Sequence, residues 1–302
     1  MKTYIPRLVD AELKRGLRTS GAVEVCGPRA CGKTETARHA VNAAGGSHIR
    51  LDVAGAQMDL LRSAPEQILV GEAPRLIDEW QSIPEVWNLV RHEVDDRGEK
   101  GQFILTGSST PDEDSSRHSG AGRIRRLTMR TLSLHERGLT QAKVSLVSLL
   151  DGTATPEGSV DAGVGAYISW MAAGGWPGFV GLDAEDAVEE VAAYIEQIEE
   201  HDYPSVGGMR RDPRRFRAFL RAYAGLVAQP ASFAAIRRRI GEVSQGEPSE
   251  RVVPLLHNFA SRLFLVEDQP AWSTRLRSAT ALVQTPKRHL ADVSLAMSLL
   301  GG

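Results

Sequence analysis

The strongest constraint on the fold lies at residues 27–34, which match the pattern G-x-x-x-x-G-K-[ST]. An apolar run at 22–26 predicts a strand directly before the pattern, and a helical stretch follows it to about residue 43. Glycine at 27 and 32 admits backbone conformations that a side chain would block, so amide groups and the helix N-terminus can point at phosphate oxygens. The pattern therefore predicts a phosphate-binding loop made of Gly27, Pro28, Arg29, Ala30, Cys31, Gly32, Lys33 and Thr34.

Two side chains of this loop have expected roles toward ATP and Mg²⁺. The Lys33 ammonium would contact the β- and γ-phosphates, and the Thr34 hydroxyl would supply an oxygen ligand to Mg²⁺. Cys31 admits two interpretations: a small side chain that fits the loop, which we favour, or a thiolate whose oxidation blocks nucleotide.

A carboxylate pair follows another short apolar run, 75–78, which predicts a buried strand. Asp78 would hold Mg²⁺ from across the site, and Glu79 would orient or deprotonate an attacking water. The alternative is that the pair merely begins a helix, where acidic residues are common. Next to a phosphate-binding loop, we favour the metal and water roles.

Small hydroxyl residues end a further predicted strand, 102–106, about thirty residues after Asp78. A hydroxyl there can sense the γ-phosphate and position water, and we favour Ser108 over Thr106 for this role. Ordinary turn chemistry, in which serine and glycine simply end a strand, is the alternative.

The polar, glycine-rich segment 116–126 carries several arginines. An arginine can neutralise charge on a phosphoryl group in transfer, either within its own chain or from a neighbouring subunit. Arg123 is our candidate, and both arrangements stay open. The alternative is a solvated loop whose arginines face water.

Periodicity divides the chain into two predicted domains with a linker at 146–162. Residues 1–145 alternate short apolar runs with helical stretches, which is typical of an α/β fold with a parallel sheet covered by helices. Residues 163–302 are mostly helical, and their order of helix, short helix, helix and strand after Asp212 is typical of a winged helix. We expect this strand at 263–266.

The overall composition excludes several classes of protein. The 302 residues contain no run of about 18 apolar residues and only two cysteines, so we expect a cytoplasmic protein with no membrane partner and no disulfide framework. The net charge of −2 provides no general attraction to nucleic acid.

Charge is nevertheless distributed unevenly in the second half. Residues 183–202 carry nine acidic residues and no lysine or arginine, whereas residues 205–240 carry nine arginines and one aspartate. The arginines of 210–240 could bind DNA phosphates, or the two runs could pair with each other. Because the two charges nearly cancel, we favour internal pairing.

Several motifs together resemble bacterial and archaeal AAA-type ATP-binding proteins. They are residues 4–7 (Tyr-Ile-Pro-Arg), 27–34, 76–81, 101–109, 118–123, 174–178 (Gly-Gly-Trp-Pro-Gly), 211–213, 266–272 and 286–289. The resemblance covers nearly the whole chain and implies an AAA-type P-loop domain followed by a domain of unknown function. Many members continue into a third domain similar to PD-(D/E)XK nucleases. The sequence stops at Gly302, just after the segment that would precede that domain, so the resemblance implies no nuclease chemistry for these residues.

These features favour a slow Mg²⁺-dependent ATPase whose nucleotide state moves the second domain, with homo-oligomer formation and DNA binding left open. The alternative is a binding module that ATP merely gates, with incidental hydrolysis. A small-molecule kinase is disfavoured, because the adjacent acids Asp78 and Glu79 suit water as the acceptor.

Overall fold

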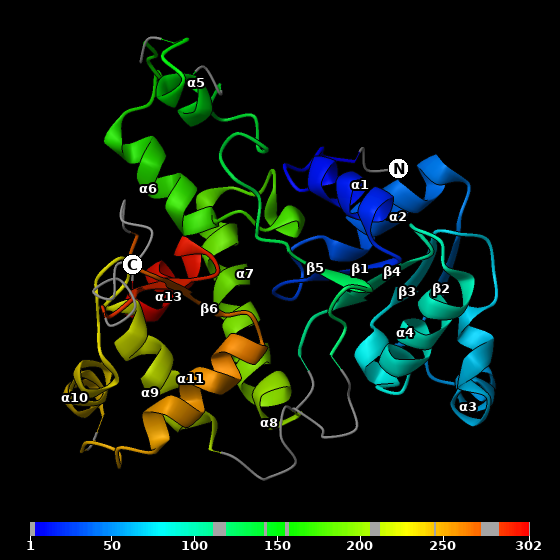
Figure 1. Cartoon of the computed structure of the whole chain (residues 1–302). Helices are drawn as coiled ribbons and strands as arrows, with labels where there is room; N and C mark the ends of the chain where they lie inside the picture. The colour runs from blue at the N-terminus through cyan, green and yellow to red at the C-terminus, as the bar shows by residue number, and fades with distance from the viewer. Residues whose placement is uncertain are drawn as a thin grey trace.

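The structure is a computed structural model that describes residues 4–110, 119–141, 144–154, 157–205, 212–244, 246–272 and 284–301. An α/β region at the N-terminal side is followed by a mainly helical region (Figure 1). Within the described residues, no helix is long and apolar enough to span a membrane.

A five-stranded parallel sheet forms the first region, in the order β2-β3-β4-β1-β5. Its strands are β1 (Ala22–Cys26), β2 (Ser47–Arg50), β3 (Arg75–Asp78), β4 (Phe103–Gly107) and β5 (Ile124–Thr128). The three central strands are buried along their whole length, as expected for apolar strands of a parallel sheet. The predicted α/β class is therefore confirmed. The fifth strand, β5, was not predicted, because three arginines precede and interrupt its apolar positions.

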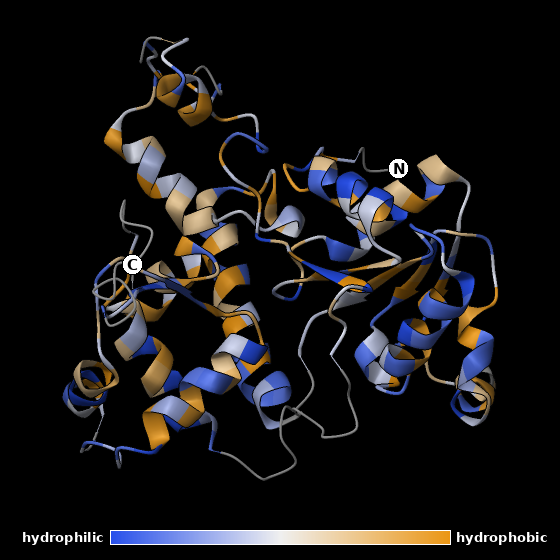
Figure 2. Ribbon diagram, in the orientation of Figure 1, coloured by the Kyte–Doolittle hydropathy of each residue, from blue (hydrophilic) through white to orange (hydrophobic). Residues whose placement is uncertain are grey.

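Helices cover both faces of the sheet. They are α1 (Asp10–Thr19), α2 (Lys33–Ala44), α3 (Ala56–Ser63) and α4 (Val86–Arg97), with 3₁₀ turns η1 (Pro65–Leu69) and η2 (Trp80–Ser82). Leu76 and Ile104 pack with α1 and α2, whereas their neighbours Ile77 and Leu105 pack with α3 and α4. Successive strand residues thus enter opposite layers, and Figure 2 shows the apolar strands between them.

Parallel register places the ends of three strands at one edge of the sheet. Asp78 of β3 is paired with Thr106 of β4, and Cys26 of β1 with Gly107. The loop after β1 and the predicted carboxylates and hydroxyls therefore meet at the carboxyl edge, where ligands bind in open α/β sheets. Ile124 is paired with Ala22, so the start of β5 lies at the opposite edge.

The second region is built from helices around one apolar core. Its elements are α6 (Val164–Ala173), η3 (Pro177–Phe179), α7 (Ala184–Gln197), the π-helical turn η4 (Ile198–Asp202), α8 (Tyr203–Ser205), α9 (Pro213–Ala224), α10 (Phe233–Val243), α11 (Val252–Arg262), β6 (Val266–Gln269), β7 (Lys287–Leu290) and α13 (Val293–Leu300). The Asp212 side chain accepts from the Arg214 amide and Ser232 from the Ala235 amide, so both predicted helix caps form. The predicted strand lies three residues later than expected, at β6, and pairs antiparallel with β7.

The predicted linker contains a short helix, α5 (Leu146–Leu150), whose Leu146 and Leu150 side chains are exposed. Figure 1 shows α5 and the start of α6 projecting from the rest of the second region. The position of the domain boundary at 146–162 stays a prediction.

Candidate active site

The loop between β1 and α2 requires glycine at two positions. A Cβ atom on Gly27 would lie 2.2 Å from the carbonyl oxygen of Met129, the residue after β5, so there is no room for a side chain there. Gly32 adopts a left-handed conformation, with φ of 100°, where it precedes the first turn of α2. The backbone of this loop is thus held close to β5 and turned into the helix N-terminus, which is the geometry that a phosphate-binding loop needs.

Lys33 is almost fully buried, with 4% of its surface exposed. Its Nζ atom donates hydrogen bonds to the carbonyl oxygens of Gly27 (3.0 Å) and Pro28 (2.8 Å), so the ammonium group spans the loop. Both acceptors are neutral, and phosphate oxygens would be stronger partners for the buried charge. The ammonium is therefore placed where a bound phosphate can recruit it.

Asp78 is the centre of a buried cluster of oxygens. The Thr34 hydroxyl donates to Asp78 Oδ1 at 2.8 Å, and the Thr106 hydroxyl donates to the same oxygen. Only 1% of Asp78 is exposed, and its Oδ2 atom lies 3.8 Å from His48 Nε2 and 3.9 Å from Arg50 Nε. A hydroxyl and a carboxylate in contact are the hard oxygen donors that Mg²⁺ prefers, so the residues fit this ion.

Glu79 points its carboxylate toward the end of β4. Ser108 Oγ donates to Glu79 Oε1 at 2.9 Å, and the Gln81 amide donates to the other oxygen. The backbone of Glu79 is left-handed, with φ of 56°, a conformation uncommon for a residue other than glycine. Such outliers gather at functional sites, where the surrounding structure holds a side chain in a required direction.

Five residues of the loop, Glu79 and Ser108 line one cavity of about 510 Å³, a size typical of small-molecule sites, and Asp78 reaches it through its partner Thr34. Its lining residues are Arg29, Ala30, Gly32, Lys33, Thr34, Glu35, Asp52, Glu79, Gln81, Ser82, Ser108 and Pro177. Pro177 belongs to the second region, so the cavity is closed on one side by that region. Sequence reasoning did not assign Pro177 or Asp52 to the site, because the motif that contains Pro177 belongs to the second region and Asp52 belongs to no motif.

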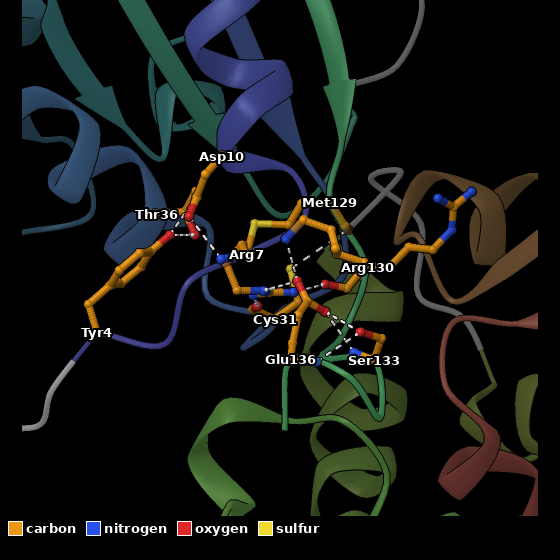
Figure 3. Close-up of polar contacts among 10 residues, drawn as sticks. Tyr4, Arg7, Asp10, Cys31, Thr36, Met129, Arg130, Ser133 and Glu136 are labelled. Atoms are coloured by element: carbon orange, nitrogen blue, oxygen red, sulfur yellow. Dashed lines mark hydrogen bonds and ion pairs between the residues drawn. The ribbon is translucent and has the colours of Figure 1, made fainter. Parts of the chain in front are cut away.

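A buried ion pair, between Arg7 and Glu136, holds the phosphate-binding loop in place (Figure 3). Arg7 donates from Nε to Glu136 Oε1 at 3.0 Å, and also to the carbonyl oxygens of Cys31 (2.8 Å) and Arg130 (2.7 Å). Burial tends to raise the pKa of Glu136, but hydrogen bonds from the amides of Ser133 and Leu8 and from Arg7 outweigh it and hold that pKa below its ordinary value. Arg7 thus ties the loop to the segment after β5.

Replacing Arg7 with methionine is expected to cost about 3–5 kcal/mol of unfolding free energy, because Glu136 is left as an unpaired buried charge. Urea unfolding of the intact chain measures this loss. Combining Arg7→Met with Glu136→Gln should recover most of it, because glutamine is neutral and its oxygen can still accept from the Ser133 and Leu8 amides. Since the pKa of Glu136 is depressed, its stabilising contribution is present at neutral pH and is lost as the pH falls through its folded-state pKa. A loss below about 1 kcal/mol at pH 7 would contradict this role.

Arg123 does not lie at the cavity of its own chain. It precedes β5 at the amino edge of the sheet, and its Nε atom pairs with Asp95 at 2.8 Å. This position does not support a role in cis, since the phosphate-binding loop is at the other edge. A role toward a neighbouring copy stays a prediction. Residues 116–118 of the same segment lie outside the described residues.

The Cys31 thiol is buried, and burial raises its pKa. Its environment therefore disfavours the thiolate, and the packing interpretation of this residue is the better one.

The predicted pairing between the acidic and basic runs is limited. Glu199 of η4 pairs with Arg217 of α9 at 3.1 Å, and burial, opposed by Arg217, raises the pKa of Glu199 to about 7. The glutamates of α7 are exposed and have no ion-pair partner among the described residues: Glu185, Glu189, Glu190 and Glu196. Arg210 and Arg211 lie outside those residues.

This fold and site define a P-loop protein of the AAA type. Residues 19–137 match the family of AAA domains, and residues 165–302 match a domain of unknown function, DUF8612. The chain therefore carries an AAA domain followed by a DUF8612 domain, which confirms the resemblance inferred from its motifs. None of the curated proteins matches it by sequence.

The fold is shared with a solved structure. A Walker-type ATPase of Pyrococcus abyssi aligns over 98% of this chain and 96% of its own, with 13% identity and a TM-score of 0.54. A signal transduction ATPase with numerous domains and a tetratricopeptide repeat sensor, from Pyrococcus horikoshii, aligns over 99% of this chain and 42% of its own, with 15% identity and a TM-score of 0.36. The first similarity supports the fold alone, and the second is too low to support an argument.

Proposed function

We propose that this chain is a slow Mg²⁺-dependent ATPase whose nucleotide state moves its C-terminal region. The observation that carries the proposal is the 2.8 Å contact between Asp78 and Thr34, because Thr34 lines the cavity together with Lys33 and Glu79. A cation-binding oxygen pair, a buried ammonium and a carboxylate directed at the cavity are the groups that phosphoryl transfer to water requires.

Each group has a separate task in this mechanism. Lys33 and the amides of the loop bind the β- and γ-phosphates, and Thr34 and Asp78 would hold Mg²⁺, which neutralises charge on those phosphates. Glu79 orients the attacking water and accepts its proton, after exchanging its present donors for that water. Ser108, released from Glu79, is free to contact the γ-phosphate.

The C-terminal region contacts several parts of the site, which supports its coupling to nucleotide. Thr110, two residues after Ser108, exchanges two 3.0 Å hydrogen bonds with Arg262 at the end of α11. Arg130 pairs with Glu267 of β6 at 2.8 Å, and the Leu132 amide donates to Gly175. A change in the loop or the strand ends would therefore be transmitted to that region.

An alternative is a nucleotide-gated module in which hydrolysis is incidental. It is favoured by one observation: both oxygens of Glu79 are already engaged, by Ser108 and Gln81. A water would have to displace one of these donors before Glu79 could orient it. Loss of function in Lys33→Ala but not in Glu79→Gln would support this alternative.

Phosphate release from Mg·ATP tests the proposed activity. We expect release that needs Mg²⁺ and no added acceptor, and a rate per molecule that rises with protein concentration if Arg123 acts on a neighbouring copy. A requirement for a small-molecule acceptor would indicate a kinase instead.

DNA is the candidate partner of the C-terminal region. The sequence α9, α10, α11, β6 and β7 follows the order of a winged helix. Arg214 and Arg221 are seven residues apart on α9 and therefore share a face, and Arg238 is on the adjacent α10. All three are exposed and have no ion-pair partner within the described chain, so they are available to phosphate groups.

Replacing Arg214, Arg221 and Arg238 with alanine is expected to weaken binding to duplex DNA about tenfold or more at low salt. The slope of log affinity against log salt should fall by about 2–3, since each phosphate contact contributes about 0.9. Electrophoretic shift assays at several salt concentrations measure both changes. A matched variant at three exposed arginines of the AAA domain, Arg15, Arg18 and Arg62, should leave them unchanged. Failure of the intact protein to shift DNA at low salt would exclude this partner.

A further inference from the structure

Arg29 lies at the boundary between two cavities. A second cavity, of about 190 Å³, is lined by Arg29, Gln81, Ser108, Ser109, Ile198, Asp202 and Leu263. Three of these residues, Arg29, Gln81 and Ser108, also line the main cavity. Because Ser108 and Gln81 are the partners of Glu79, this boundary is the end of the site where a γ-phosphate and its attacking water would lie.

The C-terminal region holds Arg29 in two ways. The guanidinium pairs with Asp202 Oδ1 of the π-helical turn at 2.6 Å, and the Tyr194 hydroxyl of α7 donates to the Arg29 carbonyl oxygen at 3.2 Å. The Arg29 side chain is 56% exposed and that of Asp202 is 16% exposed, so the arginine is the less enclosed of the two and has room to turn toward the main cavity, which it also lines. Single π-helical turns within a helix are frequent at functional sites.

We propose that Arg29 is the residue that distinguishes a nucleoside triphosphate from a diphosphate, because it exchanges the Asp202 carboxylate for the γ-phosphate. This inference rests on the proposed binding of Mg·ATP and adds a selectivity and a release step to it. A diphosphate has no group at that end of the site, so Arg29 keeps its contact with Asp202. A triphosphate supplies a doubly charged competitor, and the contact between the loop and the C-terminal region is released.

Other cations near the site do not fit this task. Lys33 contacts the loop carbonyls at the position expected for β-phosphate, so it serves both nucleotides. Arg50 is bound by Asp52 at 2.7 Å, and Arg123 is at the opposite edge of the sheet. Among the described cationic residues that line the main cavity, Arg29 alone pairs with the C-terminal region.

The test compares binding of Mg·ADP and of a nonhydrolysable Mg·ATP analogue to the intact chain by calorimetry. Asp202→Asn keeps the shape of the side chain and removes the competing charge. We expect Asp202→Asn to tighten binding of the analogue about three- to tenfold, because the analogue no longer has to break a partly buried ion pair. ADP binding should be unchanged. Glu267→Gln is the matched control, because it breaks another ion pair between the regions, with Arg130, away from the cavity. It should leave the ratio of the two affinities unchanged.

A second variant tests the arginine itself. Arg29→Gln should weaken binding of the analogue about tenfold and that of ADP little, and Asp202→Asn should have no further effect in its presence. An unchanged affinity ratio in Asp202→Asn, or the same increase in Glu267→Gln, would overturn the inference while the wild type still binds both nucleotides. Absence of binding by the wild type would instead overturn the proposed function, and this inference with it.

Discussion

Replacing Lys33 with alanine is expected to weaken binding of Mg·ATP about 100-fold. The buried ammonium is the strongest donor aimed into the loop, and hydrogen bonds between charged groups of this kind contribute about 1.5–3 kcal/mol each. Displacement of a fluorescent nucleotide from the intact chain measures the affinity. Affinity for ADP should fall as well, because the ammonium lies across the loop near the expected β-phosphate, which both nucleotides carry.

Two controls separate this effect from a general loss of structure. Lys14→Ala removes an exposed lysine of α1, away from the cavity, and should leave affinity unchanged. Thermal unfolding of Lys33→Ala should remain cooperative. If the Lys33 variant is folded and binds nucleotide within about threefold of the wild type, the assignment of the loop as the phosphate site is wrong.

Replacing Glu79 with glutamine is expected to lower the rate of ATP hydrolysis about 100- to 1,000-fold and to leave nucleotide affinity nearly unchanged. Glutamine keeps the size of the side chain and can still accept from Ser108, but it cannot take a proton from water. Single-turnover phosphate release measures the chemical step directly. Glu85→Gln, at an exposed carboxylate before α4, is the matched control.

The same variant decides between the two proposed functions. If hydrolysis persists in Glu79→Gln at more than about a tenth of the wild-type rate, another group activates water and the assignment of Glu79 is wrong. If hydrolysis is lost but the C-terminal region still responds to bound ATP, the gated binding module is the better description.

Local patterns predicted much of the fold and of the site. The loop, Asp78 and Ser108 each follow a short apolar run, and in a parallel sheet all such ends meet at one edge. The helix caps at Asp212 and Ser232 were also predictable, because a cap depends only on residues within one turn of the helix. The alternating burial of Leu76 and Ile77 between the two helical layers also follows from strand geometry.

Long-range partners were not predictable in this way. Arg29 and Asp202 are 173 residues apart, and Arg7 and Glu136 are 129 apart, so no spacing rule connects them. Arg123 was placed near the phosphates because its loop is basic, but the five residues after it form a strand and place it at the other edge. The opposite charges of residues 183–202 and 205–240 favoured pairing between the two runs. The glutamates of α7 are instead exposed to solvent.

Calorimetric titration of the intact chain with a nonhydrolysable ATP analogue tests the central claim most directly. The arrangement of Lys33, Thr34 and Asp78 predicts saturable binding of one analogue per chain in excess Mg²⁺ and much weaker binding in EDTA. Binding that is absent, or that is equally strong without a divalent cation and in Lys33→Ala, would contradict it.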